Sequence, residues 1–328
     1  MIIISRCPYR VSLLGGSSDL DWYVNQSGYG IAIGFAIKLY SRVVVTYRES
    51  SDKGILNYSS REEYRDIDAI SHPIIRACLN RFNITNKLEL SSFGGSLQGS
   101  GLGSSSSFSV ALVKAITKLN TLKLNNSEVA HHASEIEISD LKKLIGRQDQ
   151  YLCALGGVNV LEFKPNGIVN NCNQNNIKTA VERFSKNLYL VNTAISRSAT
   201  KKLSDLKNDM NTVSFINDIR QIAISFLEKS KSLNQNDIEE LLGIYLLDSW
   251  RIKRKMFGVM NKELLDIETK ILKSEFKVLK LLGAGGGGYF LVSYNGNMLS
   301  NAKSELQKYG LMLTKIEICN EGCSSLSF

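Results

Sequence analysis

The segment GSGLGSSSS at residues 99–107 lies between a strand-like run, Leu88–Phe93, and a run with helical apolar spacing that begins at Phe108. Glycine lets a backbone turn tightly and approach a ligand, and the first turn of a helix offers unpaired N–H groups to an anion. The order strand, glycine-rich loop, helix therefore predicts a phosphate-binding loop. The alternative is a flexible Gly/Ser linker, against which the amphipathic helix directly after the loop argues.

The loop departs from the two common glycine-rich patterns. Gly103 is followed by Ser104 where a Walker loop requires a lysine, and the third glycine comes one residue too early for the dinucleotide pattern G-x-G-x-x-G. Serine hydroxyls take the place of the ammonium group. Hydroxyl oxygens bind phosphate through hydrogen bonds, and they also suit magnesium, a hard cation that prefers oxygen ligands.

The chain has 328 residues, of which 43% are hydrophobic and 22% charged, and this suits a soluble protein of two domains. No apolar run approaches the roughly 18 residues that span a membrane, and residues 1–7 resemble no signal peptide, so we expect a cytoplasmic protein. Six scattered cysteines and three histidines show no zinc-site spacing. The net charge of +9 is spread along the chain, which favours a phosphorylated small molecule over nucleic acid or a membrane as partner.

Local patterns predict alternating strands and helices. We expect strands at residues 2–5, 42–47, 158–163, 188–192, 289–294 and 311–318. We expect helices at residues 127–145, 199–233, 236–261 and 301–309. In the first of these helices Ser127 is the expected N-cap and Gly146 ends the helix. Residues 170–187, rich in asparagine and lysine, are interpreted as a surface excursion near a domain boundary.

Two further segments are rich in glycine, RCPYRVSLLGGSSD at residues 6–19 and KLLGAGGGGYF at residues 280–290. Each alone fits a turn beside a strand. Together with residues 99–107 they resemble the three signature motifs of the GHMP small-molecule kinases, the family of galactokinase, homoserine kinase, mevalonate kinase and phosphomevalonate kinase. The resemblance spans nearly the whole chain.

Within that family the likeness is greatest to bacterial D-glycero-D-manno-heptose 7-phosphate kinases. It is carried by GRQDQY at residues 146–151, GGVNVLEF at 156–163, ISRSA at 195–199 and the GAGGGG loop. One departure concerns residues 15–21, which read GGSSDLD where those kinases more often show a GGGTD-like turn. The sugar pocket is therefore less well matched than the nucleotide pocket.

The resemblance implies an α+β fold with two domains. Residues 1–180 would form the N-terminal ATP-binding domain, like domain 2 of ribosomal protein S5, and residues 181–328 a ferredoxin-like C-terminal domain. The implied reaction is ATP-dependent phosphorylation of the anomeric hydroxyl of heptose 7-phosphate, giving the 1,7-bisphosphate used for nucleotide-activated heptose and surface polysaccharide. The alternatives are another sugar kinase, of the fucokinase or galactokinase type, and a catalytically dead sensor of sugar and nucleotide.

The resemblance also implies cofactors, ATP and Mg²⁺, and residues that hold them. The ATP phosphates would lie on Gly99, Ser100, Gly101, Leu102, Gly103, Ser104, Ser105 and Ser106. Ser105 is the expected magnesium ligand, with Ser104 as alternative. Glu137 is the expected carboxylate partner, and Glu135 and Asp140 are its rivals.

Asp149, in the middle of GRQDQY, would accept or orient the proton of the attacking sugar hydroxyl. Arg10 would stabilise the charge that develops during phosphoryl transfer. The residues expected to bind the sugar phosphate are Gly15, Gly16, Asp19, Ser196, Arg197, Gly286 and Gly287. Among them Arg197 is assigned to the sugar's phosphate group, and Asp19 has a turn-capping role as its alternative.

Overall fold

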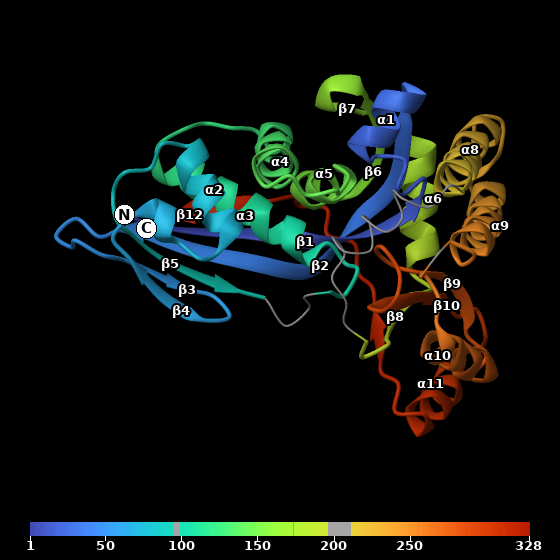
Figure 1. Ribbon diagram of the computed structural model, residues 1–328. Coiled ribbons are helices and arrows are strands. Elements are labelled where there is room, and N and C mark those ends of the chain that lie inside the picture. The colour runs from blue at the N-terminus through green and yellow to red at the C-terminus, as the bar shows by residue number, and fades with distance from the viewer. Residues whose placement is uncertain (95–98, 173, 196–210, 257) are drawn as a thin grey trace.

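The computed structural model describes residues 1–94, 99–172, 174–195, 211–256 and 258–328. Within these residues the strands form one sheet of eight strands and one of four, and helices cover both sheets (Figure 1). The architecture is α+β, as predicted. None of the helices in the described ranges is both long enough and apolar enough to cross a lipid bilayer.

The larger sheet runs in the order β12-β1-β2-β5-β3-β4, with β6 paired to β2 and β7 to β6. Its strands are β1 (Ile2–Leu14), β2 (Gly30–Tyr47), β3 (Gly54–Asn57), β4 (Arg61–Tyr64), β5 (Leu88–Phe93), β6 (Val158–Lys164), β7 (Ile168–Asn171) and β12 (Ser324–Ser327). Four helices lie on one face: α2 (Pro73–Arg81), α3 (Ser104–Leu119), α4 (Asn126–Glu135) and α5 (Gln148–Leu155) (Figure 1). Apolar side chains from the sheet and these helices form the first hydrophobic core.

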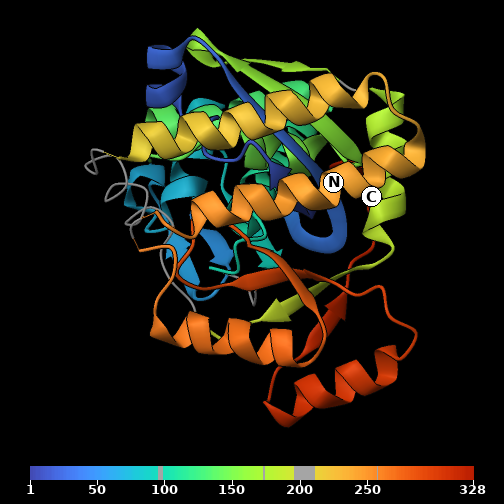
Figure 2. The same ribbon diagram turned by 90° about the vertical axis from the view of Figure 1, so that its right-hand side faces the viewer.

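The smaller sheet has the antiparallel order β11-β8-β10-β9, built from β8 (Leu188–Asn192), β9 (Lys277–Leu281), β10 (Tyr289–Ser293) and β11 (Leu313–Lys315). Helices α10 (Lys262–Lys273) and α11 (Leu299–Lys308) share a core with it. A further core joins β1 and β2 to α6 (Asn175–Ser185), α8 (Thr212–Ser230) and α9 (Gln235–Lys253). Figure 2 shows α8 and α9 side by side across this junction.

The pairing of β1 with β2 shifts register between Pro8 and Tyr9. Before the shift Ser5 points to α3, where its hydroxyl donates to a backbone carbonyl. After the shift Arg10 and Ser12 point to the same helical side and contact the start of α5. In a regular strand, residues five positions apart face opposite sides, so the irregularity has turned the strand over. A proline, which lacks an N–H, is tolerated within a sheet at such a bulge.

The helix predicted at residues 127–145 has both ends misplaced. Helix α4 is capped by Asn125, whose side chain accepts from the backbone N–H of Glu128 in a capping box, and not by Ser127. The chain then passes into a π-helical turn, η3 (Ile136–Asp140), and leaves helical geometry where Lys142 adopts φ of +53°. Residues 148–155 form the separate helix α5, so Asp149 lies in the first turn of a helix.

Other expectations hold in part. Strands 2–5 and 42–47 are confirmed but extend as β1 and β2 over 2–14 and 30–47, and the strands at 158–163, 188–192 and 289–294 are confirmed. The helix predicted at 301–309 corresponds to α11, and the helix predicted at 236–261 corresponds to α9, which ends at Lys253. Of the helix predicted at 199–233, residues 199–210 lie outside the described residues, and α8 covers residues 212–230.

Two predictions near the sheet edges and the domain boundary are wrong. Residues 170–187 are not a surface excursion, because they hold β7 and the amphipathic helix α6, whose Ile177, Ala180 and Val181 are buried. The predicted strand at 311–318 is only the three residues of β11, and the chain then returns to the larger sheet, where β12 pairs with β1. The expected domain boundary at residues 180/181 falls inside α6 and stays a prediction.

Sequence patterns did not reveal several short elements. These are α1 (Asp21–Ser27), β3, β4, α2, α10 and the 3₁₀ turn η1 (Ile67–Ala69). Most are shorter than the window over which an apolar period is recognisable.

Candidate functional site

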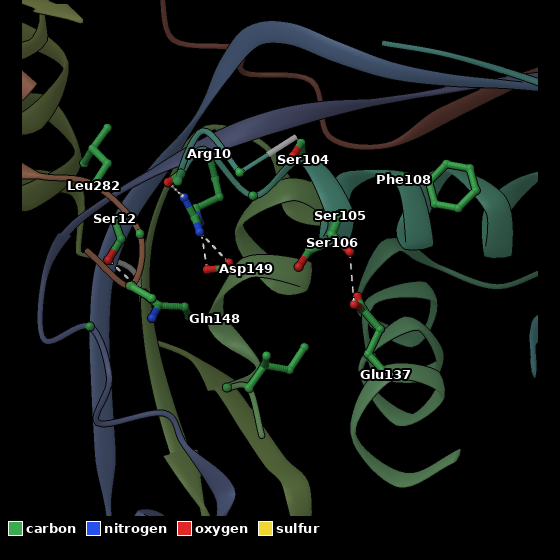
Figure 3. A pocket seen from close by; sticks show the side chains of 18 of the residues that line it. Arg10, Ser12, Ser104, Ser105, Ser106, Phe108, Glu137, Gln148, Asp149 and Leu282 are labelled. Carbon is green, nitrogen blue, oxygen red and sulfur yellow. Dashed lines mark hydrogen bonds and ion pairs between the residues drawn. The ribbon is translucent and has the colours of Figure 1, made fainter. Parts of the chain in front are cut away.

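A cavity of about 720 Å³ opens where the two sheets meet. Its walls come from β1, the loop before α3, the first turns of α3 and α5, the π-helical turn η3, and the loop that follows β9. The three glycine-rich segments, which are far apart in the sequence, all contribute to its lining. Figure 3 shows side chains from these elements converging on it.

The predicted phosphate loop leads directly into α3, which begins at Ser104. Gly103 is the N-cap with φ of +74°, a conformation that favours glycine. Six of the eight residues predicted to hold the ATP phosphates line the cavity: Gly99, Gly101, Gly103, Ser104, Ser105 and Ser106. Amides in the first turn of an α-helix can donate to an anion placed before the helix, and Ser105 and Ser106 of this turn lie at the cavity.

The other two predicted residues of this loop support it from behind. Leu102 is buried, and its carbonyl accepts from the backbone N–H of Arg10 at 3.0 Å. Ser100 is 6% exposed, and its hydroxyl accepts from the N–H of Leu102 at 3.2 Å. These bonds fix the loop to β1.

The loop also packs against the third glycine-rich segment, backbone to backbone. A Cβ atom at Gly101 would lie 2.5 Å from the carbonyl oxygen of Leu282, and one at Gly288 would lie 2.4 Å from that of Ser100. Both glycines have positive φ. Only glycine satisfies both constraints, which explains why these two segments are rich in it.

Arg10 and Asp149, the two predicted catalytic residues, form an ion pair in the cavity (Figure 3). Arg10 Nε donates to Asp149 Oδ1 at 2.7 Å, and a second bond joins Nη2 to Oδ2. Arg10 Nη1 donates to the carbonyl of Gly101 at 2.5 Å. The guanidinium is thus held between the carboxylate and the phosphate loop, and the fork geometry suits both at once.

Glu137 is the acidic residue that reaches the phosphate loop, as predicted. Its Oε2 accepts from Ser105 Oγ at 3.3 Å, and its Oε1 accepts from Ser109 Oγ at 2.9 Å. Lys143 Nζ and Gln150 Nε2 donate to the same carboxylate at 2.8 and 3.0 Å. The side chain is 1% exposed, so these four donors hold it in one orientation.

The rivals of Glu137 are engaged elsewhere. Glu135 pairs with Arg147 at 2.7 Å, and Asp140 accepts two bonds of 2.8 Å from Arg81. Arg147 also donates both remaining nitrogens to Asp21, so it ties α1 and α4 to the start of α5.

The residues around Ser105 fit a magnesium ion in the nature of their donors. Hydroxyl and carboxylate oxygens are the hard ligands that Mg²⁺ prefers. The described part of the chain holds no group of three or more His, Cys, Asp or Glu side chains that could bind a metal.

Asp19 also lines the cavity, where it contacts Gln148, the residue before Asp149. Its carboxylate accepts from the backbone N–H and the side-chain Nε2 of Gln148, at 2.9 and 2.8 Å. A Cβ atom at Gly146 would lie 1.9 Å from Asp19 Oδ2, so this approach requires the glycine of GRQDQY. Ser12 donates to Gln148 Oε1 at 2.8 Å and completes the chain of bonds.

Burial raises the pKa of Asp19 to about 6 from 3.8, and the charge of Asp149 adds to the rise, while hydrogen bonding from Gln148 opposes it. We therefore expect kcat/KM for the sugar to fall as the pH drops below about 6, because a protonated Asp19 is a weaker acceptor for hydroxyls. Asp19→Asn should lower kcat/KM at pH 8 by about 10- to 100-fold and remove this acidic limb. A pH–rate profile of both proteins checks the result.

The raised pKa of Asp19 also makes its contribution to folding stability depend on pH. Because the folded-state pKa lies above 3.8, the contribution of Asp19 is fully present below that pH and is lost as the pH rises through about 6. The melting temperature of Asp19→Asn relative to wild type should thus be higher at pH 8 than at pH 4. An unchanged difference between the two pH values would contradict the assignment.

Of the other residues predicted to bind the sugar, some line the cavity and others do not. Gly16 and Gly287 line the cavity. Gly15 has a packing role, since a Cβ there would lie 2.1 Å from the carbonyl of Ile31, and the N–H of Gly286 donates to the carbonyl of Val259 at 2.8 Å. Ser196 and Arg197 lie outside the described residues.

Sequence reasoning missed several lining residues. Tyr58, His72 and Phe108 form an aromatic group. The ring centroid of His72 lies 4.9 Å from that of Tyr58 and 5.3 Å from that of Phe108. Lys253 and Lys280 also line the cavity. Lys280 is the first residue of KLLGAGGGGYF, so its position before a glycine-rich turn could have indicated a site residue. No sequence pattern indicated that the aromatic residues line the cavity.

Comparisons with known proteins find a kinase domain and sugar-kinase relatives. Residues 70–157 match the model of the GHMP kinases N terminal domain. Over 344 aligned residues the chain is 28% identical to a D-glycero-alpha-D-manno-heptose 7-phosphate kinase of Campylobacter jejuni, covering 98% of both chains. It is 24% identical to an L-fucokinase/L-fucose-1-P guanylyltransferase of Bacteroides fragilis, covering 88% of this chain and 34% of that protein.

Two solved structures have the same fold over nearly their whole length. A D-glycero-D-manno-heptose 1-phosphate kinase from Bacteroides thetaiotaomicron superimposes with a TM-score of 0.77 at 20% identity, covering 99% of each chain. Galactokinase of Lactococcus lactis, complexed with galactose, gives 0.75 at 15% identity, covering 99% of this chain and 95% of that one. The chain thus contains a GHMP kinases N terminal domain at residues 70–157, shares its fold with these sugar kinases from end to end, and gathers its three glycine-rich segments around one cavity.

Proposed function

We propose that the protein transfers the γ-phosphoryl group of ATP to the C1 hydroxyl of D-glycero-D-manno-heptose 7-phosphate. The observation that carries the proposal is the Arg10–Asp149 pair, held between the phosphate loop and the Asp19–Gln148 group in one cavity. The substrate is supported by the Campylobacter jejuni relative, which matches along 98% of the chain. The product, the 1,7-bisphosphate, would serve nucleotide-activated heptose and surface polysaccharide.

In this reaction the hydroxyl oxygen forms a bond to the γ-phosphorus, and the bond from that phosphorus to the bridging oxygen breaks to release ADP. Asp149 accepts the hydroxyl proton or holds the hydroxyl in line. Arg10 fixes the Asp149 carboxylate and offers positive charge to the equatorial phosphoryl oxygens. Asp19 and Gln148 bind other sugar hydroxyls.

The nucleotide phosphates take the N–H groups at the start of α3. Ser105 and Glu137 are the residues that would hold Mg²⁺, which supplies charge neutralisation for the phosphates when bound. Gly103 leaves no space for a side chain beside Arg10, since a Cβ there would lie 3.0 Å from Arg10 Cγ. The loop and the guanidinium can thus approach the same phosphoryl group.

A coupled ADP assay with a panel of free and phosphorylated heptoses and hexoses, followed by NMR of the product, tests the proposal. We expect turnover of heptose 7-phosphate and a new phosphate at C1. Turnover of a free hexose or fucose without turnover of heptose 7-phosphate would instead favour a fucokinase or galactokinase type, the alternative that the Bacteroides fragilis relative supports. Absence of ADP with every sugar would favour a catalytically dead sensor.

Arg197→Ala separates phosphorylated from free sugar substrates. If Arg197 binds the sugar's phosphate, as the motif ISRSA suggests, the variant should raise KM for heptose 7-phosphate by about 10- to 100-fold, because a charged hydrogen bond contributes about 1.5–3 kcal/mol. Initial-rate kinetics measure this. If the natural substrate is a free sugar, KM for that sugar should stay nearly unchanged.

A further inference from the structure

Lys280 is a buried lysine in the wall of the catalytic cavity. It lies in β9 and is only 5% exposed. Its ammonium donates to the carbonyl of Leu13 at 2.7 Å. No carboxylate within the described residues pairs with it, so the positive charge is matched only by a neutral backbone acceptor.

Lys280 does not stand alone. Lys253, at the end of α9, donates to the carbonyls of Leu281 and Gly283 at 3.1 and 2.5 Å, which places its ammonium on the turn that follows Lys280 in the chain. Burial holds the pKa of Lys280 well below its usual range, and the charges of Lys253 and Arg10 lower it further. Arg10, Lys253 and Lys280 all line the same cavity.

Such an arrangement is unfavourable in an empty cavity. Removing an ammonium group from water costs several kcal/mol, and one carbonyl satisfies one of its three N–H donors. The other cations of the cavity differ in this respect, since Arg10 is paired with Asp149 and Lys143 with Glu137. An anion with several acceptor oxygens would supply what Lys280 lacks.

The position of Lys280 assigns the anion to the sugar side. Leu13 follows Ser12, whose hydroxyl bonds Gln148, the partner of Asp19. Figure 3 shows Leu282, two residues beyond Lys280, on the opposite side of the Arg10–Asp149 pair from Phe108 and Glu137. Ser105 and Glu137, the residues expected to hold the metal ion, therefore lie on the far side of that pair from Leu282, whereas Gly101 of the phosphate loop packs against Leu282.

We propose that Lys280, assisted by Lys253, binds the phosphate group that the acceptor sugar already carries, and so selects phosphorylated over free sugars. This inference rests on the proposed function, which supplies the phosphorylated acceptor. It adds a second phosphate contact, from β9 and α9, to the one expected from Arg197. The chemistry recognised is a phosphate monoester dianion attached to a polyhydroxy chain.

The test compares Lys280→Met with Lys277→Met, a control on the same strand whose side chain is exposed. Methionine keeps most of the length of the unbranched side chain and removes the charge. We expect Lys280→Met to raise KM for heptose 7-phosphate about 10- to 100-fold and to leave KM for ATP within about twofold. Lys277→Met should match wild type in both.

Two results would overturn the subsite. One is an unchanged KM for heptose 7-phosphate in Lys280→Met. The other is an equal rise in KM for ATP and for the sugar phosphate, which would place Lys280 on the nucleotide phosphates. Wild-type turnover of heptose 7-phosphate, measured in the same experiment, tests the proposed function separately.

A folding defect is recognised by thermal unfolding without ligand. Lys280→Met removes a buried charge, so we expect its melting temperature to equal or exceed that of wild type. Lys280→Gln, which keeps a donor for the carbonyl of Leu13, is the second variant. The same selective rise in KM in Lys280→Gln supports the subsite, and its absence there opposes it.

Discussion

Asp149→Asn should lower kcat by about 10³-fold while the affinity for nucleotide stays within about threefold. Asparagine has nearly the shape of aspartate, but its amide neither takes up the hydroxyl proton nor accepts both bonds from Arg10. The phosphate loop is held by other contacts, such as the bond from the backbone N–H of Arg10 to the carbonyl of Leu102, so the variant should still bind nucleotide. The ADP assay gives kcat, and calorimetry with a non-hydrolysable ATP analogue gives the affinity.

Asp140→Asn is the matched control for this variant. Asp140 also accepts two bonds from one arginine, Arg81, but this pair is not among the residues that line the catalytic cavity. It should keep full activity. If Asp149→Asn retained more than about a tenth of wild-type kcat, Asp149 would not have the role proposed for it. An equal loss in nucleotide affinity would assign it a structural role instead.

The second large effect is expected for Arg10→Lys, which should lower kcat by about 10²- to 10³-fold although the charge is kept. Arg10 uses three nitrogens at once, two toward Asp149 and one toward the carbonyl of Gly101. A lysine ammonium is a single point and cannot span both partners. Initial rates at saturating ATP and sugar measure the loss, and Arg81→Lys serves as the control.

A double-mutant cycle shows whether the two residues act as one unit. If Arg10 works by fixing Asp149, the combined Arg10→Lys, Asp149→Asn variant should be about as slow as the slower single variant. Fully additive losses would mean that each residue acts independently. The kcat values of the four proteins suffice for this comparison.

The local parts of the site were predictable from the sequence. The loop at 99–107, its lack of lysine and the helix after it predict a phosphate-binding loop within about ten residues, and the structure has Gly103 at the N-cap of α3. The choice of Asp149 and Arg10, and of Ser105 and Glu137, came from the family resemblance; that Asp149 pairs with Arg10 is seen only in the structure. Periodicity alone placed Asp149 at the end of a helix, whereas it lies in the first turn of α5.

The sequence by itself determined features that depend on neighbouring residues along the chain. These are the glycine conformations, the starts of helices and the chemical nature of the loop at 99–107. Which side of β1 carries Arg10 was decided only by the tertiary structure, because the register shift after Pro8 reverses the alternation of side chains. The burial of Lys280 was decided in the same way, since β9 reaches the cavity only by packing against the end of β1. Contacts between distant segments set these positions, and no local pattern encodes them.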